Sequence, residues 1–151
     1  MTKLFLEDLV VGQTFGSGRL QIDARSIKHF AVEFDPQPFH LDEQAARETI
    51  FRGLAASGWH TAALTMRLLV ESDFKPANGL VGASMDELSW PRPVRPGDEL
   101  HIEIEILEIR LSKSRQGQGI VKIRVVTLNQ ANKAVQIYIA NIVVLGRRKE
   151  E

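Results

Sequence analysis

Two neighbouring stretches of the sequence organise the chain. Residues 35–42 read Asp35-Pro36-Gln37-Pro38-Phe39-His40-Leu41-Asp42, and residues 53–60 read Gly53-Leu54-Ala55-Ala56-Ser57-Gly58-Trp59-His60. Proline fixes φ and disfavours helix at the residue before it, so the first stretch is predicted to be stiff and non-helical. Asp35 and His40 are then expected to keep a fixed relative position, which suits a general acid–base pair. The alternative is that Asp35 caps a turn and His40 is a partly buried structural histidine.

The second stretch is predicted to begin a long helix. Ser57 is a good N-cap, Gly58 falls in the first turn, and apolar residues follow at three- and four-residue spacing: Ala62, Ala63, Met66, Leu69 and Val70. The first N–H groups of a helix lack internal partners and attract an oxygen that gains negative charge. Because first-turn positions tolerate side chains, Gly58→Val is predicted to disturb a bound ligand with little loss of stability. The alternative is an ordinary helix start that needs only its cap.

The composition indicates one ordinary globular domain, spanning residues 1–151. Apolar residues make up 44% of the chain and charged residues 25%. Lys and Arg together number 19, as do Asp and Glu, so no general charge favours nucleic acid or an anionic membrane. The absence of cysteine excludes disulfides, thiolate catalysis and Cys-ligated zinc. Acids at residues 7 and 8 argue against a signal peptide, so a cytoplasmic protein without a membrane span is expected.

The remaining pattern predicts helices first and strands later. A first strand over 14–22 precedes a helix that Asp23 caps and whose apolar face is Ile27, Phe30 and Phe34. Further helices are predicted over 43–50, capped by Asp42, and over 58–72. Strands follow over 80–90, 100–111, 120–129 and 135–145, and the last three should be consecutive and antiparallel. The long helix carries apolar residues over most of its circumference, so a sheet that wraps it should bury it on several sides. This layout is an α+β architecture.

At this point the sequence resembles the MaoC-like acyl dehydratases, relatives of the (R)-specific enoyl-CoA hydratases. The resemblance is carried by Phe34 to Asp42, by Ala45, Ala46 and Phe51, by Gly53 to Gly58, and by Trp90-Pro91-Arg92-Pro93-Val94-Arg95-Pro96-Gly97-Asp98. It covers nearly the whole chain, from about residue 15 to residue 145. The family usually has Asn where this chain has Gln37, often His where it has Ser57, and in some members Ser where it has Ala63.

The resemblance implies a single hot-dog domain, in which an antiparallel sheet wraps one long central helix. It also implies syn addition of water across a 2-enoyl thioester, or the reverse reaction, with Asp35 and His40 sharing one water. The Gly58 amide would stabilise the enolate oxygen. Coenzyme A would be part of the substrate, or acyl carrier protein would replace it, with no metal and no further cofactor. A homodimer or a larger even-numbered assembly is expected, with sites between subunits.

Several other residues are candidates for substrate binding, namely Pro38, Phe39, Ser57, Trp59, His60, Arg92 and Arg95. His60 either lines the pocket or packs under Trp59. Arg92 and Arg95 suit the phosphates of coenzyme A, although most surface arginines bind nothing. His29 and His101 are interpreted as structural or solvated, and the four histidines are too scattered to suggest a metal site.

Two alternatives to a hydratase remain. The first is a non-catalytic acyl-thioester-binding or assembly subunit that retains the fold, which the departures at Gln37 and Ser57 keep open. The second is a thioesterase, which would need a carboxylate on the long helix. Residues 58–70 contain no acid, and this argues against the second alternative.

Overall fold

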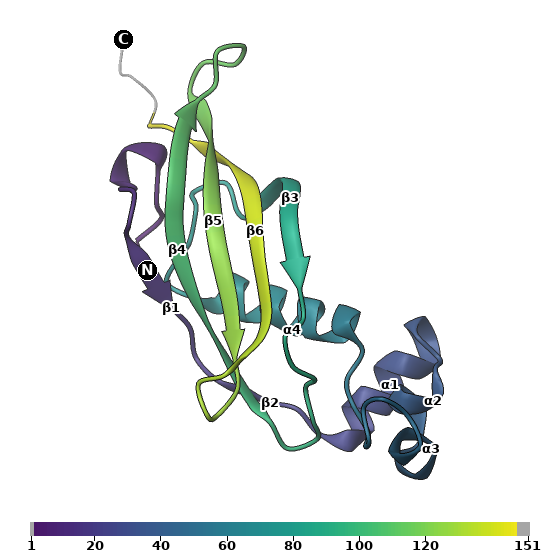
Figure 1. Ribbon diagram of the computed structural model, residues 1–151. Coiled ribbons are helices and arrows are strands. Elements are labelled where there is room, and N and C mark those ends of the chain that lie inside the picture. The colour runs from purple at the N-terminus through teal and green to yellow at the C-terminus, as the bar shows by residue number, and fades with distance from the viewer. Residues whose placement is uncertain (1, 148–151) are drawn as a thin grey trace.

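The computed structural model describes residues 2–147. Its elements in chain order are η1 (Leu6–Asp8), β1 (Thr14–Gly16), β2 (Leu20–Gln21), α1 (Ala24–Phe34), α2 (Pro38–Leu41), α3 (Glu43–Arg47), α4 (Gly58–Glu71), β3 (Val81–Ser89), β4 (Glu99–Leu111), β5 (Gln118–Leu128) and β6 (Ala134–Leu145). Strands of one antiparallel sheet follow the order β1-β4-β5-β6-β3, and β2 pairs with the end of β4 (Figure 1). The α+β prediction and the three consecutive antiparallel strands are confirmed.

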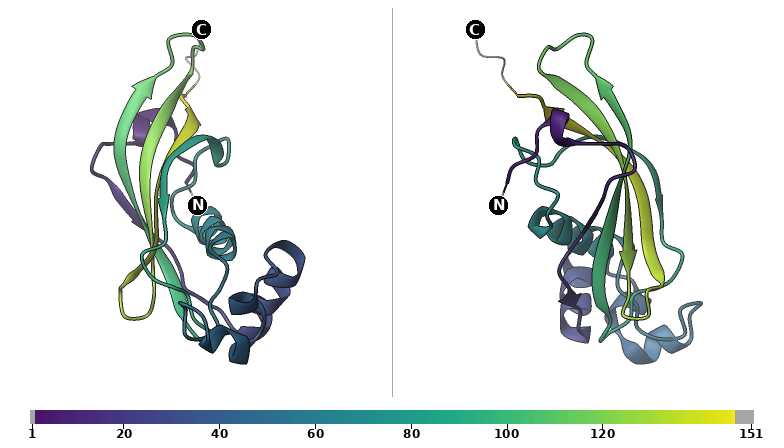
Figure 2. Two further views of the ribbon diagram at one scale, coloured as in Figure 1. Left: turned by 45° about the vertical axis from the view of Figure 1, so that its right-hand side comes forward. Right: turned by 90° about the vertical axis from the view of Figure 1, so that its left-hand side faces the viewer.

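The sheet buries one face, as the alternation along β4 predicts. Ile102, Ile104 and Ile106 are completely buried, whereas Glu103 between them is exposed. Helix α4 lies across this inner face of the curved sheet (Figures 1 and 2). The core therefore sits between one long helix and the apolar side of the sheet.

Helix α4 is less enclosed than the sequence suggests. Four of its five buried positions, Thr61, Thr65, Leu68 and Leu69, follow the helical period on the side of the sheet, and the fifth, His60, packs against α1. Of the five apolar positions that marked the helix, only Leu69 is buried. A single sheet covers only one side of a helix, so Trp59, Met66 and Val70 remain 60%, 42% and 49% exposed.

The three short helices form a cluster at the end of the molecule where α4 begins (Figure 1). Helix α1 starts at its predicted cap, since the Asp23 carboxylate accepts the Ser26 N–H at 2.8 Å. The Asp42 carboxylate likewise accepts the Gln44 N–H at 3.0 Å and caps α3. Phe34 does not belong to the buried face of α1, because it is 69% exposed at the last turn.

Three local predictions are wrong. Residues 38–41 form a helical turn, because Pro38 occupies the first helical position, where its fixed φ fits and its missing N–H costs nothing. The strand expected over 14–22 is broken into β1 and β2, and Ser17 between them donates its hydroxyl to the Gly18 carbonyl. Helix α3 ends at Arg47, three residues before its expected end.

Candidate active site

Asp35 is held where α1 ends. Its N–H donates to the Ala31 carbonyl as the helix C-cap, and Pro36 then prevents continuation. The carboxylate accepts three contacts. Gln37 Nε2 donates to Oδ1, the Ser57 hydroxyl donates to Oδ2 at 2.7 Å, and His40 Nε2 lies 3.3 Å from Oδ2. The position of the Asp35 carboxylate is therefore fixed both by its neighbours in the sequence and by Ser57 at the start of α4.

The surroundings of Asp35 keep it ionised. Burial of the carboxyl works to raise its pKa. Hydrogen bonds from Gln37 and Ser57, together with the charge of His40, outweigh burial and place the pKa below its usual range. At neutral pH Asp35 is thus a carboxylate that can accept a proton or a hydrogen bond.

His40 is buried in α2, and its orientation is set by the segment before α4. Its Nδ1 lies 2.6 Å from the Ala55 carbonyl. A carbonyl only accepts, so Nδ1 carries the proton and donates it. The Ala55 N–H in turn donates to the Phe39 carbonyl at 3.0 Å, which ties the same residue back to α2. Nε2 is therefore the nitrogen that faces Asp35, and in neutral His40 it is free to accept a proton.

The start of α4 brings a helix N-terminus to the same place. Ser57 is fully buried, and its hydroxyl oxygen accepts the Trp59 N–H at 3.3 Å, as an N-cap should. Gly58 follows, and among the described residues no acceptor is found for its amide. A Cβ atom at Gly58 would lie 2.6 Å from the indole ring of Trp90. The expectation that this position tolerates a side chain is therefore wrong, because an aromatic ring occupies the space.

One pocket joins these groups. It has a volume of about 330 Å³ and is lined by Asp35, His40, Phe51, Ala56, Gly58, Trp59, Thr61, Trp90, Pro91, Arg92, Pro93 and Val94. An ionised carboxylate, an imidazole nitrogen and an amide at a helix start thus face the same space. Such a set can move a proton and stabilise an oxygen that becomes negative.

Residues 9–129 match the family model described as the MaoC like domain. The chain belongs to the MaoC-like dehydratase family. The crystal structure of a MaoC-like dehydratase from Rhodospirillum rubrum is 58% identical, with a TM-score of 0.93 over 97% of this chain and 99% of that chain. The R-hydratase PhaJ1 from Pseudomonas aeruginosa, in its unliganded form, is 29% identical, with a TM-score of 0.73 over 99% and 93% of the two chains. The uncharacterized protein YdeM of Bacillus subtilis (strain 168) is 34% identical, over 95% of this chain and 99% of its own. The resemblance seen in the sequence and its hot-dog fold are confirmed.

Some predicted binding residues of the MaoC-like domain do not line the pocket. Pro38 is exposed at the start of α2, and Phe39 packs edge-on against His40 with ring centroids 4.6 Å apart. His60 stacks on Phe30 of α1 with centroids 4.7 Å apart, rather than packing under Trp59. Burial lowers the pKa of His60, and no partner for its Nδ1 is found within residues 2–147. Of these three side chains, only Phe39 contacts a member of the Asp35–His40 pair.

The two arginines of the loop after β3 differ in their surroundings. Arg95 donates from its guanidinium to the carbonyls of Phe51, Gly53 and Leu54, so it braces the segment before α4 and is not available to a phosphate. Arg92 lines the pocket, is exposed, and makes a single bond, at 3.1 Å, to the Ala134 carbonyl. Arg92 is therefore the better candidate for an anionic group of a ligand.

Sequence reasoning missed several residues of the pocket wall, chiefly Trp90, Phe51 and Thr61. Trp90 belongs to the stretch that marked the family, but its sequence neighbours give no sign that its ring reaches Gly58. Gln136 gives a stronger sequence signal for the position of Trp90 than the neighbours of Trp90 do. It is a polar residue at an inward position of β6 and is completely buried, where it accepts the Trp90 indole N–H at 2.8 Å.

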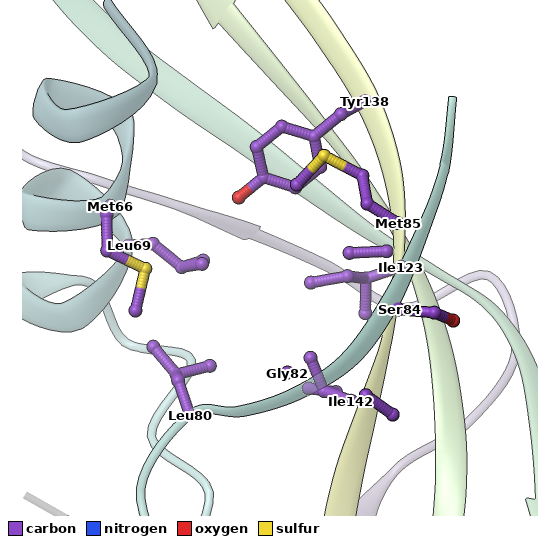
Figure 3. A pocket seen from close by; sticks show the side chains of 11 residues that line it. Met66, Leu69, Leu80, Gly82, Ser84, Met85, Ile123, Tyr138 and Ile142 are labelled. Atoms are coloured by element: carbon purple, nitrogen blue, oxygen red, sulfur yellow. The ribbon is translucent and has the colours of Figure 1, made fainter. Parts of the chain in front are cut away.

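A second cavity of the MaoC-like domain lies further along α4 and has a volume of about 270 Å³ (Figure 3). It is lined by Met66, Leu69, Leu80, Gly82, Ala83, Ser84, Met85, Ile123, Tyr138, Ala140 and Ile142. The Tyr138 hydroxyl points into it toward α4 (Figure 3), and burial raises the pKa of Tyr138 to about 12. The phenol therefore stays neutral, and the cavity is almost entirely apolar.

The part of the chain that the structure describes lacks a cluster of metal ligands and a membrane-spanning helix. Residues 2–147 contain no cluster of three or more His, Asp or Glu side chains that could hold a metal ion. In the same range, no helix is both long and apolar enough to cross a membrane.

Proposed function

We propose that this protein adds water to a 2-enoyl thioester, or removes it from the corresponding 3-hydroxyacyl thioester, with Asp35 and His40 as the acid–base pair. The observation that carries the proposal is the 3.3 Å approach of His40 Nε2 to Asp35 Oδ2 in one pocket with Gly58, whose amide has no acceptor within residues 2–147. Hydratase or dehydratase chemistry is also what the family and the R-hydratase neighbour support.

The geometry suggests how the pair would act. Asp35 is ionised and can accept a proton, and because Nδ1 of His40 donates to the Ala55 carbonyl, Nε2 is the His40 nitrogen that would exchange a proton at this site. A water bound beside both groups would give one proton to the pair while its oxygen bonds to the β-carbon. The pair would return one proton to the α-carbon, so that a hydrogen and a hydroxyl are added in total. The two groups share their protons as a coupled pair, so the roles of base and acid belong to the pair.

The start of α4 would stabilise the charge that this step creates. As the oxygen attacks, electrons move onto the thioester oxygen, which becomes enolate-like. Gly58, the first residue of α4, lines the pocket, and its N–H together with the positive end of the helix dipole would hold that oxygen. Removing one such donor typically costs about a hundredfold to a thousandfold in rate.

The substrate class follows from the two cavities. The apolar cavity of Figure 3 begins near Met66, eight residues after Gly58 and hence roughly 12 Å along the helix axis. It is suited to an acyl chain, and exposed Arg92 at the other pocket is suited to a phosphate of coenzyme A or of a carrier-protein arm.

The two departures from the family pattern argue against a non-catalytic subunit. Gln37 and Ser57 both donate to the Asp35 carboxylate, so they preserve a supported anion rather than dismantle the site. Helix α4 does not place the carboxylate that a thioesterase would need at the pocket. The helix ends in Glu71, which is exposed, pairs with Arg67 at 3.1 Å, and lies at the end of the helix opposite to the pocket.

We also propose a homodimer or a larger even-numbered assembly. The outward face of α4 exposes Trp59, Met66 and Val70, and the edge strand β3 exposes Val81 and Met85 beside it. Apolar residues on a helix face and an unpaired strand edge both call for cover. Light scattering at micromolar concentration should give at least twice the mass of one chain, and a monomeric mass would refute the assembly.

The test of the activity is hydration of crotonyl-CoA and longer 2-enoyl-CoA thioesters, followed as loss of enoyl absorbance. Asp35→Asn and His40→Ala should each lower kcat at least about a hundredfold, because each removes a proton-transfer group. His29→Ala is the matched control, since His29 is exposed on α1 and pairs with Glu33 at 3.6 Å, away from the residues that line the pocket. Turnover close to the parent's in either site variant would refute the assignment, and hydration of no thioester in the panel would refute the activity.

A further inference from the structure

A line of buried polar side chains runs through the core between α4 and the sheet. Thr65 of α4, Thr127 of β5 and Gln136 of β6 are each completely buried. The next inward residues on the same strands, Val125 and Tyr138, are those of an apolar core. Burying polar groups is unfavourable unless they are hydrogen-bonded, so these three require partners.

Each of the three has a partner, and the bonds of Gln136 have a defined direction. The Thr65 and Thr127 hydroxyls lie 2.6 Å apart, and Gln136 Nε2 donates to Thr65 Oγ1 at 3.0 Å. This leaves Gln136 Oε1 as an acceptor, and the Trp90 indole N–H donates to it at 2.8 Å. An indole N–H can only donate, so it sets the orientation of the Gln136 amide and leaves Nε2 facing the Thr65 hydroxyl. We call this series, Trp90–Gln136–Thr65–Thr127, the Trp90 tether.

The tether ends at the catalytic pocket. Trp90 is the first residue after β3, is 40% exposed, and lines the same pocket as Asp35 and His40. Three atoms of its indole would lie 2.6–2.9 Å from a Cβ atom at Gly58, so the ring is seated directly on the glycine. Its face also meets the edge of Trp59, with centroids 5.4 Å apart and the planes at 81°.

We propose that Trp90 is a positioning residue for the thioester, and that the buried tether is what holds it. The proposal rests on the function proposed above. An oxygen that binds the Gly58 amide must lie beside the indole ring, so the ring limits the directions from which the thioester can approach. Without the bond to Gln136, the ring could turn about its side-chain torsions and open that wall. The acyl group would then bind in several orientations, only some of which place its β-carbon at the Asp35–His40 pair.

The first test separates positioning from packing. Gln136→Leu removes the acceptor while the Thr65 and Thr127 hydroxyls continue to bond each other. Trp90→Phe keeps a ring and removes the indole N–H. Each should lower kcat/KM by about tenfold to a hundredfold, with KM raised, because a small misplacement of a reacting group has effects of that size. The double variant should be no worse than the more severe single variant, since both break the same bond.

Ser72→Ala is the matched control. Ser72 is also buried and polar, but its hydroxyl bonds the Leu69 carbonyl at the far end of α4. It should lower the melting temperature without changing kcat/KM. If Gln136→Leu does not fold, Trp90→Phe carries the test alone, because it changes a side chain that is 40% exposed rather than one that is completely buried.

The second test uses no turnover. The chain has two tryptophans, so an ¹H–¹⁵N NMR spectrum should contain two indole N–H signals. Gln136→Leu should move one of them, and adding butyryl-CoA, which has no double bond to hydrate, should move the same one in the parent protein.

The outcomes distinguish the two proposals. If the parent hydrates enoyl-CoA but both variants keep kcat/KM within twofold, or if their losses multiply in the double variant, the role of the tether is refuted and the activity stands. If no thioester is hydrated but butyryl-CoA still moves the Trp90 signal, the hydratase proposal fails and Trp90 remains part of a thioester-binding site. If butyryl-CoA moves neither signal, Trp90 does not contact the thioester.

Discussion

The contact between Gly58 and Trp90 makes a prediction about stability that can be worked out from the coordinates. In Gly58→Ala, the new methyl group would start 2.6 Å from the indole, and the ring cannot simply retreat because Gln136 holds its N–H. Overpacking of this kind costs about 1–3 kcal/mol. Alanine in place of glycine in a helix returns at most about 1 kcal/mol, and less in the first turn. The net loss should be about 1–2 kcal/mol, or about 2–8 °C in Tm for a chain of this size.

The assay is thermal unfolding of four proteins, namely the parent, Gly58→Ala, Trp90→Ala and the double variant. Without the ring, the added methyl group should cost nothing, so the two substitutions should couple by about 1–2 kcal/mol. Gly16→Ala is the matched control, because a Cβ atom at Gly16 would find no atom within 4 Å. An equal effect of Gly58→Ala with and without the indole would refute the contact as the reason for glycine at this position.

Two further predictions concern the residues that support the site. Ser57→Ala removes a donor to Asp35, so the pKa of that carboxyl should rise and the acid limb of the kcat/KM profile should move to higher pH, while loss of the N-cap costs about 1 kcal/mol. A carboxyl with a depressed pKa stabilises the fold above its unfolded-state pKa, and this stabilisation is lost as the pH falls through its folded-state pKa. In Ser57→Ala the free energy of unfolding should therefore begin to fall at a higher pH than in the parent. An acid limb of kcat/KM unchanged from the parent's would contradict the prediction. Arg95→Leu should destabilise the fold by about 2–3 kcal/mol, measured by urea unfolding, because three carbonyls lose a charged donor. The stability of Arg95→Lys should lie between that of the parent and that of the Leu variant. A Leu variant as stable as the parent would show that these hydrogen bonds do not stabilise the fold.

The sequence predicts most of the fold because its signals are local. Alternation places Ile102, Ile104 and Ile106 inside, and the aspartates before α1 and α3 cap helices as their positions indicate. One of its three local errors, the missed helical turn at Pro38, comes from applying the proline rule to the residue before it and overlooking that proline fits the first helical position. Local rules of this kind carry over to the structure because neighbours in sequence decide them.

The wall of the pocket could not be predicted in the same way. Trp90 meets Gly58 across 32 residues of chain, and Gln136 meets Trp90 across 46. Contacts between residues so far apart in the sequence produce no periodicity and no motif. The one sequence signal for them is Gln136, a polar residue at an inward strand position. Arg95 shows the converse, because an arginine in a proline-rich loop looks free in the sequence, yet its guanidinium is bonded to three carbonyls of a distant segment.

That bracing has a consequence for how this site can change. The segment before α4 and the loop after β3 both line the pocket. They are joined by the Arg95 guanidinium and by the bond from the Ala56 N–H to the Val94 carbonyl at 2.9 Å. An insertion in one loop would pull on the other, so the two walls cannot diverge independently. To change the substrate preference of this fold by exchanging segments, residues 51–58 and 90–98 would have to be exchanged together.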